Sequence, residues 1–561
     1  MISRIAAALA ITLSTLGASA SAQPLTADEQ DRVEEVLQDL AGEGEPGVAV
    51  GIVRGGEIVL EHYDGLADLS HSIAIGPQTR FNIASNAKQY VALMVLDLAE
   101  QDRVDLDAPL REYLPDTLRA ISTPITVREL MTHRSGLRDV YDLWSLAGLT
   151  WWEEPLTNDD AMALLGRQCA LNFSPGSEYL YSNSNYIFLA ELIEAVSGES
   201  FPVYAEEFFS RLGMDDTGWR PRYAAIVPDR ARAYGRWDGW LEDPALANLF
   251  GDGFLFSTLA DQLHWESQLQ GAPSSLPDAV IAASQQASLD TESGSYGAGL
   301  EHRDFRGLRE ISHVGSTGGY NAYLRRFPDE QLSIVVLGNT TEIGVVALGN
   351  NLADALVGDL YGDLPTYPAG PETTLARPVL TDILGLYDSG SSLIRIVERD
   401  GALYRELEGR EPERLVHENG NIFAYETIPD LKIAFEPSDD GARGFRLFLP
   451  SQPVNAFTRL PPLPDDVAIL RGMSGTYVNR ETEAQLVLSI DGPEDVEIRL
   501  NDTEGSASVI AEDDLRWNGY RLRIRRNDAG DPVGLLLDGN RIRNVVFHKV
   551  PSGAQRLCSS L

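Results

Sequence analysis

The apolar positions before residue 363 follow helical and strand-like spacings in turn. One set recurs every three or four residues and predicts a helix: Val33, Val36, Leu37 and Leu40. The run from Val48 to Val53 predicts a strand, and Gly55-Gly56 predicts a turn before a second apolar run, Ile58 to Leu60. Alternating helices and strands are typical of an α/β or α+β domain.

The pattern changes after a proline-rich stretch, residues 364–378, which we interpret as a linker. Short runs of alternating apolar and polar residues follow, such as Leu393–Val397 and Leu522–Ile524, and helical periodicity almost disappears. Turn signals separate the runs: Asp400-Gly401, Asp440-Gly441 and Asp538-Gly539. This part of the chain is therefore expected to be all-β.

The all-β part also repeats itself. Gly385 and Tyr387 recur as Gly475 and Tyr477, and Phe457 recurs as Phe547, each after 90 residues. A second proline-rich break lies at 460–466. We expect two tandem antiparallel barrels that close their own edges, at 379–460 and 466–561, after a first domain at 23–363.

The first 22 residues have the three regions of a secretory signal peptide. Arg4 precedes an apolar run, Ile5 to Leu16, and small residues follow, with Ala20-Ser21-Ala22 as the expected cleavage site. The run is shorter than the roughly 18 apolar residues of a membrane span, and no cysteine nearby would carry a lipid anchor. A periplasmic or secreted protein without a membrane anchor is predicted. The alternative is a buried N-terminal helix.

Composition and charge exclude several classes of protein. The apolar fraction of 43% is too high for a wholly disordered chain. The chain has 45 basic and 84 acidic residues, a formal charge of −39, so a nucleic-acid partner is not expected. The acidic excess favours solubility or a substrate with a cationic group. Cys169 and Cys558 either pair in an oxidising compartment or are two free thiols, and no motif suggests a metal or other cofactor.

Ser85 and Lys88 form the first candidate catalytic pair. They stand three residues apart at the start of an expected helix with one apolar face: Val91, Met94, Val95 and Leu98. A serine becomes nucleophilic when a base takes its proton, and a lysine can be that base if burial and nearby cations lower its pKa. The helix N-terminus favours an oxyanion beside Ser85. By itself the pair is common and is more typical of a solvated helix start.

Two further segments strengthen the catalytic interpretation. Tyr181 and Asn183 follow a Pro-Gly turn, where a phenol could relay protons and an amide could hold a substrate carbonyl or the lysine. His313 is followed by Gly315 and Ser316 at the start of two expected strands, 320–327 and 332–337. A glycine there would let another backbone approach, and the Ser316 amide would then face the Ser85 amide across a reacting carbonyl.

These three motifs together resemble the penicillin-recognising serine hydrolases, which include class C β-lactamases, DD-carboxypeptidases, related esterases and D-aminopeptidases. The resemblance covers residues 25 to 362. It implies a β-lactamase/transpeptidase-like α+β (α/β) domain with catalytic Ser85, Lys88, Tyr181 and His313. It also implies substrate binding by Asn183, Gly315 and Ser316. Two lesser segments, 130–137 and 251–261, support it, and His133 in the first of them is interpreted as structural.

The two barrels and the histidine in the third motif resemble the D-stereospecific aminopeptidases. In that family a loop from the last barrel enters the active-site cleft and restricts it to small substrates with a free amino group. We expect the corresponding loop near Asn501 to Trp517, with the acidic run Glu512–Asp514 as an anchor for the ammonium or as a solvated hairpin tip. β-Lactamases have a lysine where this chain has His313. We therefore do not expect strong binding of a β-lactam carboxylate, to which a protonated His313 would contribute only weakly.

The resemblance implies an acyl-enzyme mechanism without a metal or cofactor. Lys88, with Tyr181, would deprotonate Ser85, the Ser85 and Ser316 amides would hold the oxyanion, and Tyr181 with His313 would protonate the leaving group. The sequence leaves open which group is the resting base.

Three functions are consistent with the sequence. The first is a D-aminopeptidase acting on short peptides or amides. The second is a DD-carboxypeptidase, β-lactamase or carboxylesterase, and the third is a non-catalytic binder of cell-wall peptides or β-lactams. In each case the partner is a small peptide, amide or ester, and the barrels could bind, shield the cleft or form a homodimer.

Overall fold

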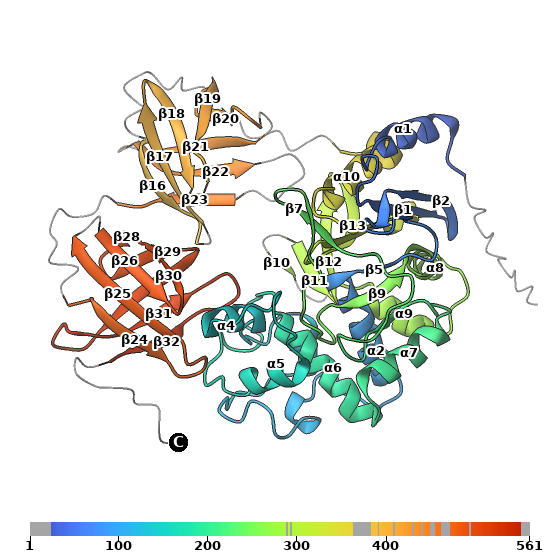
Figure 1. Cartoon of the computed structure of the whole chain (residues 1–561), viewed down its shortest axis with the longest axis horizontal. Helices are drawn as coiled ribbons and strands as arrows, with labels where there is room; N and C mark the ends of the chain where they lie inside the picture. Colours follow the sequence, from blue (N-terminus) through green and yellow to red (C-terminus); the bar gives the residue numbers. More distant parts are fainter. Residues whose placement is uncertain are drawn as a thin grey trace, which may run out of the picture.

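The computed structural model describes residues 24–362 except 288–289 and 292–293, residues 383–461 except 391, 408–409, 429–430, 439–440 and 449–454, and residues 472–550 except 493–494. The expected signal peptide, the expected linker at 364–378, most of the second break and Cys558 lie outside the described residues. The described chain forms one mixed α and β region and two β regions (Figure 1).

An eight-stranded antiparallel sheet forms the centre of the first region. The three strands expected from apolar runs are β1, β14 and β15, which are neighbours in this sheet. In spatial order the strands are β10 (Asp290–Thr291), β11 (Gly294–Gly297), β12 (Leu300–Phe305), β13 (Leu308–Thr317), β14 (Tyr320–Phe327), β15 (Leu332–Gly338), β1 (Val48–Arg54) and β2 (Glu57–Asp64).

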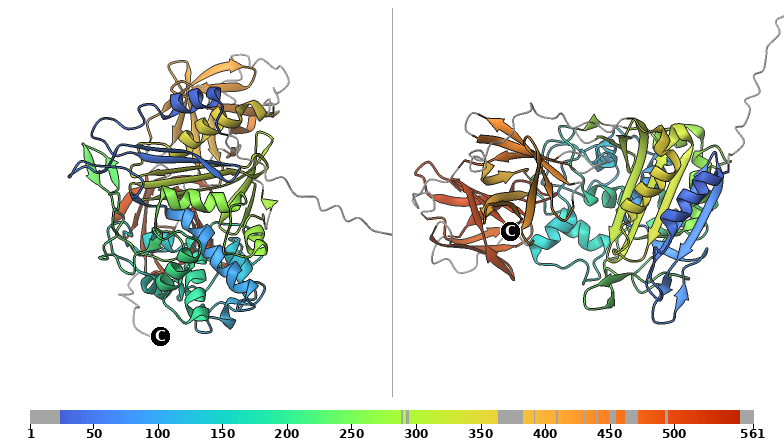
Figure 2. Two further views of the ribbon diagram at one scale, coloured as in Figure 1. Left: turned by 90° about the vertical axis from the view of Figure 1, so that its right-hand side faces the viewer. Right: turned by 90° about the horizontal axis from the view of Figure 1, so that it is seen from above.

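Helices cover both faces of the sheet (Figure 2). α1 (Ala27–Leu37) and α10 (Val345–Val357) pack on one face over a core that includes Val50, Ile334 and Leu352. α8 (Leu259–Leu269) packs on the other. The predicted first helix ends three residues before Leu40, because Gln38 is extended and Asp39 is left-handed with φ 54°. Leu40 still packs against the core.

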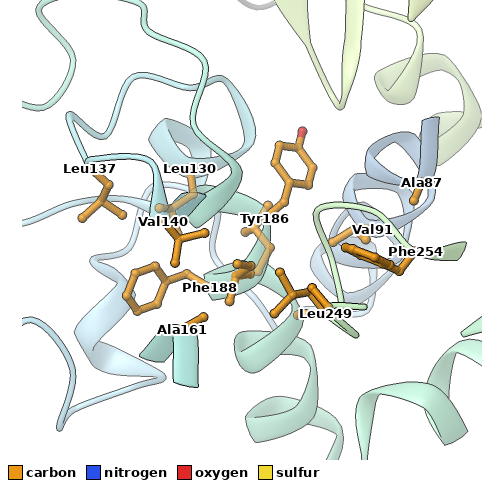
Figure 3. Close-up of a cluster of buried hydrophobic side chains, with 14 of the residues drawn as sticks. Ala87, Val91, Leu130, Leu137, Val140, Ala161, Tyr186, Phe188, Leu249 and Phe254 are labelled. Atoms are coloured by element: carbon orange, nitrogen blue, oxygen red, sulfur yellow. The ribbon is translucent and has the colours of Figure 1, made fainter. Parts of the chain in front are cut away.

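A mainly helical region lies beneath the sheet and shares a second core with it. Figure 3 shows Tyr186 and Phe188 between Val140 on one side and Val91 on the other. The helices are α2 (Lys88–Glu100), α3 (Val127–Met131), α4 (Val140–Ala147), α5 (Asn158–Leu165), α6 (Asn183–Ser197), α7 (Phe201–Arg211) and α9 (Asp278–Ser284). Short 3₁₀ turns are η1 (Ala84–Ala87), η2 (Leu110–Glu112), η3 (Pro328–Glu330) and η4 (Gly358–Leu360).

Three small sheets complete the first region. They pair β3 (Leu66–Asp68) with β4 (Ile73–Ala74), β5 (Arg80–Asn82) with β9 (Leu255–Thr258) and β6 (Gly218–Trp219), and β7 (Tyr234–Arg236) with β8 (Trp240–Glu242). The β5–β9 pair matters for the site, since it leads the chain directly into η1.

The all-β prediction is confirmed for the residues after 382 that the structure describes. The first barrel is closed, with strands β16 (Gly385–Asp388), β17 (Leu393–Arg399), β18 (Ala402–Leu407), β19 (Glu413–Asn419), β20 (Ile422–Tyr425), β21 (Lys432–Ser438), β22 (Gly441–Phe448) and β23 (Asn455–Arg459). The second is a nine-stranded sheet whose edge strands, β27 (Thr503–Ser506) and β28 (Ser508–Ala511), are separated by one residue, so it is nearly closed. Its other strands are β24 (Gly475–Asn479), β25 (Gln485–Gly492), β26 (Asp495–Leu500), β29 (Asp514–Trp517), β30 (Tyr520–Arg526), β31 (Pro532–Asp538) and β32 (Val545–Lys549).

The 90-residue repeat is visible in the structure. Tyr387 pairs with Arg459 across the first and last strands of one barrel, and Tyr477 pairs with Lys549 in the other. Both hydroxyls donate to the carbonyl four residues earlier, at 2.7 Å for Tyr387 and 2.5 Å for Tyr477. The two tyrosines therefore occupy equivalent positions in duplicated barrels.

The second barrel packs against the α4 side of the first region (Figure 1). Arg138 has no exposed side-chain surface and donates to Glu481 of the barrel at 2.5 Å. Arg138 also donates to the main-chain carbonyls of Arg543 and Asn544. A search of the described helices finds none with the length and apolarity needed to cross a bilayer.

Candidate active site

The local fold places Ser85 at a sharp turn. β5 leads into η1, where the Asn82 side chain accepts the Ala84 amide at 2.9 Å and Ala84 adopts a left-handed conformation with φ 47°. This turn brings the half-buried Ser85 above the first residue of α2, which is Lys88. The predicted pair is thus formed, and Lys88 Nζ donates to Ser85 Oγ at 3.0 Å.

Lys88 is fully buried among neutral acceptors. Its Nζ donates to Asn183 Oδ1 at 2.9 Å and to the main-chain carbonyl of Asp252 at 2.5 Å, besides Ser85. Burial lowers the Lys88 pKa to about 7, while the charges of Asp252 and Asp139 act against this shift and that of Arg541 adds to it. A neutral lysine is therefore populated near neutral pH.

Tyr181 lies next to both members of the pair. Lys88 Nζ is 5.0 Å from the centre of the Tyr181 ring, and the Tyr181 hydroxyl is hydrogen-bonded to Ser85. Burial raises the Tyr181 pKa well above its ordinary value, although the bond to Ser85 acts in the opposite direction. The phenol is consequently protonated at neutral pH, so the group that can accept the Ser85 proton is Lys88.

Asn183 begins α6 and links Lys88 to a buried acid. Asp139 Oδ2 accepts the Asn183 main-chain amide at 2.7 Å and its side-chain amide at 2.9 Å. The side-chain oxygen of Asn183 is thereby turned toward Lys88. Sequence reasoning allowed Asn183 to hold either a substrate carbonyl or the lysine, and in the structure it holds the lysine.

The third motif lies on an open strand edge beside the serine. β12 pairs with β13 only as far as Ser312. Residues 313–317 of β13 therefore have one strand partner, β14, in the part of the chain that the structure describes. A methyl group on Gly315 would lie 2.4 Å from the Ile83 carbonyl oxygen and 3.0 Å from the Ser85 amide nitrogen. Gly315 thus allows η1 to approach β13, and Ser316 faces the cavity.

His313 lines the cavity but carries no charge at neutral pH. Its Nδ1 lies 2.7 Å from the Val314 carbonyl, which it can approach only as a donor, and its Nε2 lies 3.5 Å from the Tyr296 hydroxyl. Burial, with the nearby Lys88 charge, lowers the His313 pKa to about 3. Burial thus keeps His313 neutral at pH 7, which argues against the expected contribution of a protonated His313 to carboxylate binding.

His133, interpreted as structural from the sequence, is buried under the second motif. Its Nδ1 accepts the Ser182 amide at 3.2 Å, and its ring centre lies 4.3 Å from that of Tyr181. His133 is not among the residues that line the cavity. These contacts support the turn that carries Tyr181 and Asn183.

Ser85 opens into a cavity of about 520 Å³ with an acidic and aromatic wall. The wall includes the following acidic and aromatic residues: Asp142, Asp252, Glu301, Tyr141, Trp151 and Tyr179. Asp252 is buried; one carboxylate oxygen accepts the Tyr141 hydroxyl at 2.5 Å, and the other has no hydrogen-bond partner among the described residues. Burial raises the Asp252 pKa to about 6, and the Lys88 charge acts against this.

A loop of the second barrel forms one side of the cavity, as the resemblance implied, but it is a different loop. Asn540 and Arg541, between β31 and β32, line the cavity. The predicted stretch 501–517 does not, since Asp513 and Asp514 pair with Arg526 and Arg521 of the same barrel at 2.6 and 2.5 Å. Two of the three acids of the run are thus paired across the strands, and none of the three lines the cavity.

Several residues of the site were not identified from the sequence. Asp252 lies inside the segment 251–261 and Asp139 lies two residues after the segment 130–137, so both were within or near recognised segments without an assigned role. Arg541 is 358 residues from Asn183 (541 − 183), and no local pattern marks it. Among the described residues, no group of three or more His, Cys, Asp or Glu is placed to hold a metal ion. Cys169 is free and exposed.

Comparison with known proteins agrees with this geometry. The Beta-lactamase family model matches residues 31–359. The chain belongs to this family. It is therefore a serine hydrolase with the β-lactamase/transpeptidase-like fold, as the three motifs implied.

Relatives and solved structures extend the similarity beyond the family model. A D-aminopeptidase of Cereibacter sphaeroides is 30% identical over 483 residues, which are 83% of this chain and 85% of the relative. The octameric penicillin-binding protein homologue of Pyrococcus abyssi has a similar fold, with a TM-score of 0.56 and 20% identity over 76% of this chain and 100% of its own. The D-amino acid amidase of Ochrobactrum anthropi has a TM-score of 0.51 and 21% identity over 59% and 99%.

Proposed function

We propose that this serine hydrolase is an exported D-aminopeptidase, which releases N-terminal D-amino acids from short peptides or amides. The observation that carries the proposal is the buried Asp252 carboxylate: Asp252 lines the Ser85 cavity, and one of its carboxylate oxygens has no hydrogen-bond partner among the described residues. A buried carboxylate that lacks a full set of partners is costly unless a ligand supplies them. A substrate ammonium is such a ligand, and Asp142 adds negative charge to the same cavity.

The reaction follows from the contacts around Ser85. Neutral Lys88 takes the Ser85 proton, and Oγ attacks the carbonyl carbon of the N-terminal residue, while the amides of Ser85 and Ser316 stabilise the oxyanion. The C–N bond then breaks, and the leaving amine takes a proton through Lys88 and Tyr181. Water attacks the resulting ester, Lys88 again accepts the proton, and the amino acid is released with Ser85 restored.

The relatives and the closed side of the cavity support a small substrate. The Cereibacter relative is named for D-aminopeptidase activity, and the Ochrobactrum neighbour for activity on D-amino acid amides. The loop carrying Asn540 and Arg541 limits the cavity on one side. A neutral His313 also leaves the third motif without the positive charge that would favour a β-lactam carboxylate.

A substrate panel tests the proposal. We expect turnover of D-alanine p-nitroanilide, but little turnover of its L-isomer, its N-acetylated form, p-nitrophenyl acetate or nitrocefin. Ser85→Ala is the control and should abolish turnover of every active substrate. Rapid ester cleavage without any D-anilide cleavage would contradict the proposal in favour of a carboxylesterase, and binding without turnover would favour a non-catalytic binder.

Export is proposed from the composition of the first 22 residues alone. When the full chain is produced in a bacterial host with a Sec pathway, the mature protein should leave the cytoplasm and begin at Gln23. N-terminal sequencing of the exported fraction measures this. An intact Met1 in a cytoplasmic product would contradict it.

A further inference from the structure

A chain of polar contacts connects the second barrel to the catalytic lysine. It runs from Arg541 in the β31–β32 loop to Asp139 before α4, then to Asn183 at the start of α6, and ends at Lys88. Four different segments of the chain supply these residues. The role of the barrel loop is therefore not limited to closing one side of the cavity.

Asp139 controls the orientation of the Asn183 amide. Its side chain has no exposed surface, and its carboxylate accepts the Tyr141 amide at 3.0 Å as well as both Asn183 groups. Because the Asn183 NH₂ donates to Asp139, the oxygen of the same planar amide points away from Asp139 and accepts from Lys88. With the amide reversed, its NH₂ group would face the Lys88 ammonium, which can donate hydrogen bonds but cannot accept them.

Arg541 holds and neutralises this buried acid. Its Nη1 lies 3.8 Å from Asp139 Oδ2, and its main-chain carbonyl accepts the Asp139 amide at 3.3 Å. Its own amide donates to Asp142 at 2.8 Å, and its guanidinium lies 4.8 Å from the Tyr181 ring centre. A buried carboxylate is strongly destabilising without a nearby positive charge. Lys88 reaches Asp139 through Asn183, so among the residues that the structure describes Arg541 is the cation that pairs with Asp139.

We propose that Arg541 is a positioning residue of the catalytic centre, supplied by the second barrel. It secures Asp139, Asp139 orients the Asn183 amide, and the amide holds Lys88 Nζ against Ser85. The barrel is then a part of the catalytic apparatus and not only a steric restriction. This inference rests on the proposed serine hydrolysis but not on the proposed D-amino acid substrate.

The charges around Lys88 give the proposal a signature in pH dependence. Asp252 and Asp139 raise the Lys88 pKa, and Arg541 lowers it. Tyr181, Tyr186, His133 and His313 also face this region, but the first two are protonated phenols and the last two neutral imidazoles at pH 7. Removing the Arg541 charge should therefore move the acid limb of reactivity to higher pH, and removing the Asp139 charge should move it to lower pH.

The test measures Ser85 labelling by a small alkyl fluorophosphonate against pH, since this reaction needs no substrate amine. We expect Arg541→Met to raise the midpoint of the acid limb by about one pH unit, which lowers the labelling rate about tenfold below that midpoint. Arg541→Lys keeps the charge and should retain most of the rate. Asp139→Asn should lower the midpoint and also reduce the maximum rate, because the Asn183 amide loses its orientation.

Arg543→Met provides the matched control. Arg543 is in the same loop, but its side chain pairs with the exposed Glu178 outside the cavity, so its profile should equal that of the unmodified enzyme. Thermal unfolding of each variant verifies the fold, and Arg541→Gln is a second neutral variant if Arg541→Met does not fold. The proposal would be overturned if Arg541→Met left the acid limb unchanged and only raised KM for D-alanine p-nitroanilide. Shifts of the acid limb in the same direction for Arg541→Met and Asp139→Asn would also overturn it. A failure of D-selectivity in the substrate panel leaves this labelling result unaffected.

Discussion

At the scale of single residues, burial decides what the catalytic groups can do. Lys88, Tyr181 and His313 all lie in the same cavity wall or directly behind it, and desolvation favours the neutral form of each. For the lysine the shift brings its pKa close to physiological pH, while the tyrosine and histidine move away from it. These shifts favour Lys88 as the base, which the sequence left undecided.

The first prediction concerns pH and Lys88. A base must be neutral to act, so kcat/KM should rise with pH through an acid limb centred near 7, the value to which burial lowers the Lys88 pKa. Lys88→Met should reduce kcat by at least about 10²–10⁴-fold, since general base catalysis is lost. Steady-state rates from pH 5 to 9 measure both effects. A flat profile in the unmodified enzyme would contradict the assignment.

The second prediction concerns the ammonium partner. Asp252→Asn should raise KM for D-alanine p-nitroanilide about tenfold or more, because the amine loses a charged acceptor. Glu301→Gln is the matched control: it neutralises another carboxylate of the wall, but one that already pairs with Arg303. Fluorophosphonate labelling of Asp252→Asn should remain rapid, since Asp252 raises the Lys88 pKa and its removal favours the neutral lysine. Equal KM effects from both variants would argue against Asp252 as the amine site.

At the scale of elements, the site depends on how closely η1 approaches β13. Gly315 lies at the contact, where its Cα faces the main chain of Ile83 and Ser85. The sequence anticipated that Gly315 lets another backbone approach and that the Ser316 and Ser85 amides face each other. It did not anticipate that the main chain of η1 itself lies against Gly315, because η1 is more than 220 residues earlier (315 − 85 = 230).

The third prediction tests this approach. Gly315→Ala places a methyl group 2.4 Å from the Ile83 carbonyl oxygen, so η1 must move. We expect a loss of stability of about 1–3 kcal/mol from overpacking and a fall in kcat of about 10²-fold from the displaced serine. Gly218→Ala in β6 is the control, since a methyl group there meets no atom within 4 Å. Urea unfolding and D-anilide turnover measure the two effects, and full activity in Gly315→Ala would exclude a close-approach role.

At the scale of the whole molecule, the second barrel is joined to the first region by buried polar contacts. Arg138 is fully buried, and Glu481 of the barrel balances its charge. Arg138 directly precedes Asp139, the acid that orients Asn183. Barrel attachment and active-site geometry are therefore connected through adjacent residues, Arg138 and Asp139.

The fourth prediction follows from this connection. Glu481→Gln leaves the Arg138 charge buried without its counter-charge, which should destabilise the protein by about 3–5 kcal/mol. Glu483→Gln is the control, because Glu483 forms an exposed pair with Arg167 at 3.5 Å and should change stability by less than about 1 kcal/mol. Denaturant unfolding of both variants measures the difference. Similar stabilities would show that the interface does not depend on the buried pair.

Local signals were sufficient for much of the architecture and for the central chemistry. Periodicity identified β1, β14 and β15, turn residues marked the all-β region, and the spacing of Tyr387 and Tyr477 revealed the repeat. Ser85 and Lys88 were identified because their separation by one helical turn is itself a local property. The same holds for Tyr181 with Asn183 and for Gly315 with Ser316.

Local signals failed wherever a function depends on what a residue meets across the fold. The acidic run 512–514 has the right charge for an amine, but arginines on the neighbouring strand pair with two of its three acids, and a less conspicuous loop lines the cavity instead. From the sequence alone, His313 would be expected to have the ordinary pKa of a histidine, but burial lowers its pKa to about 3. Asp252 and Arg541 carry no local mark of their roles.

The sequence by itself determined the elements, the duplication of the barrels, the acidic charge and the identity of the serine and lysine, since these are set by composition and by neighbours along the chain. The tertiary structure alone decided which loop completes the cavity, which acids remain unpaired and which charge states burial favours. Those outcomes depend on desolvation and on contacts between residues hundreds of positions apart, and neither is encoded in any short segment.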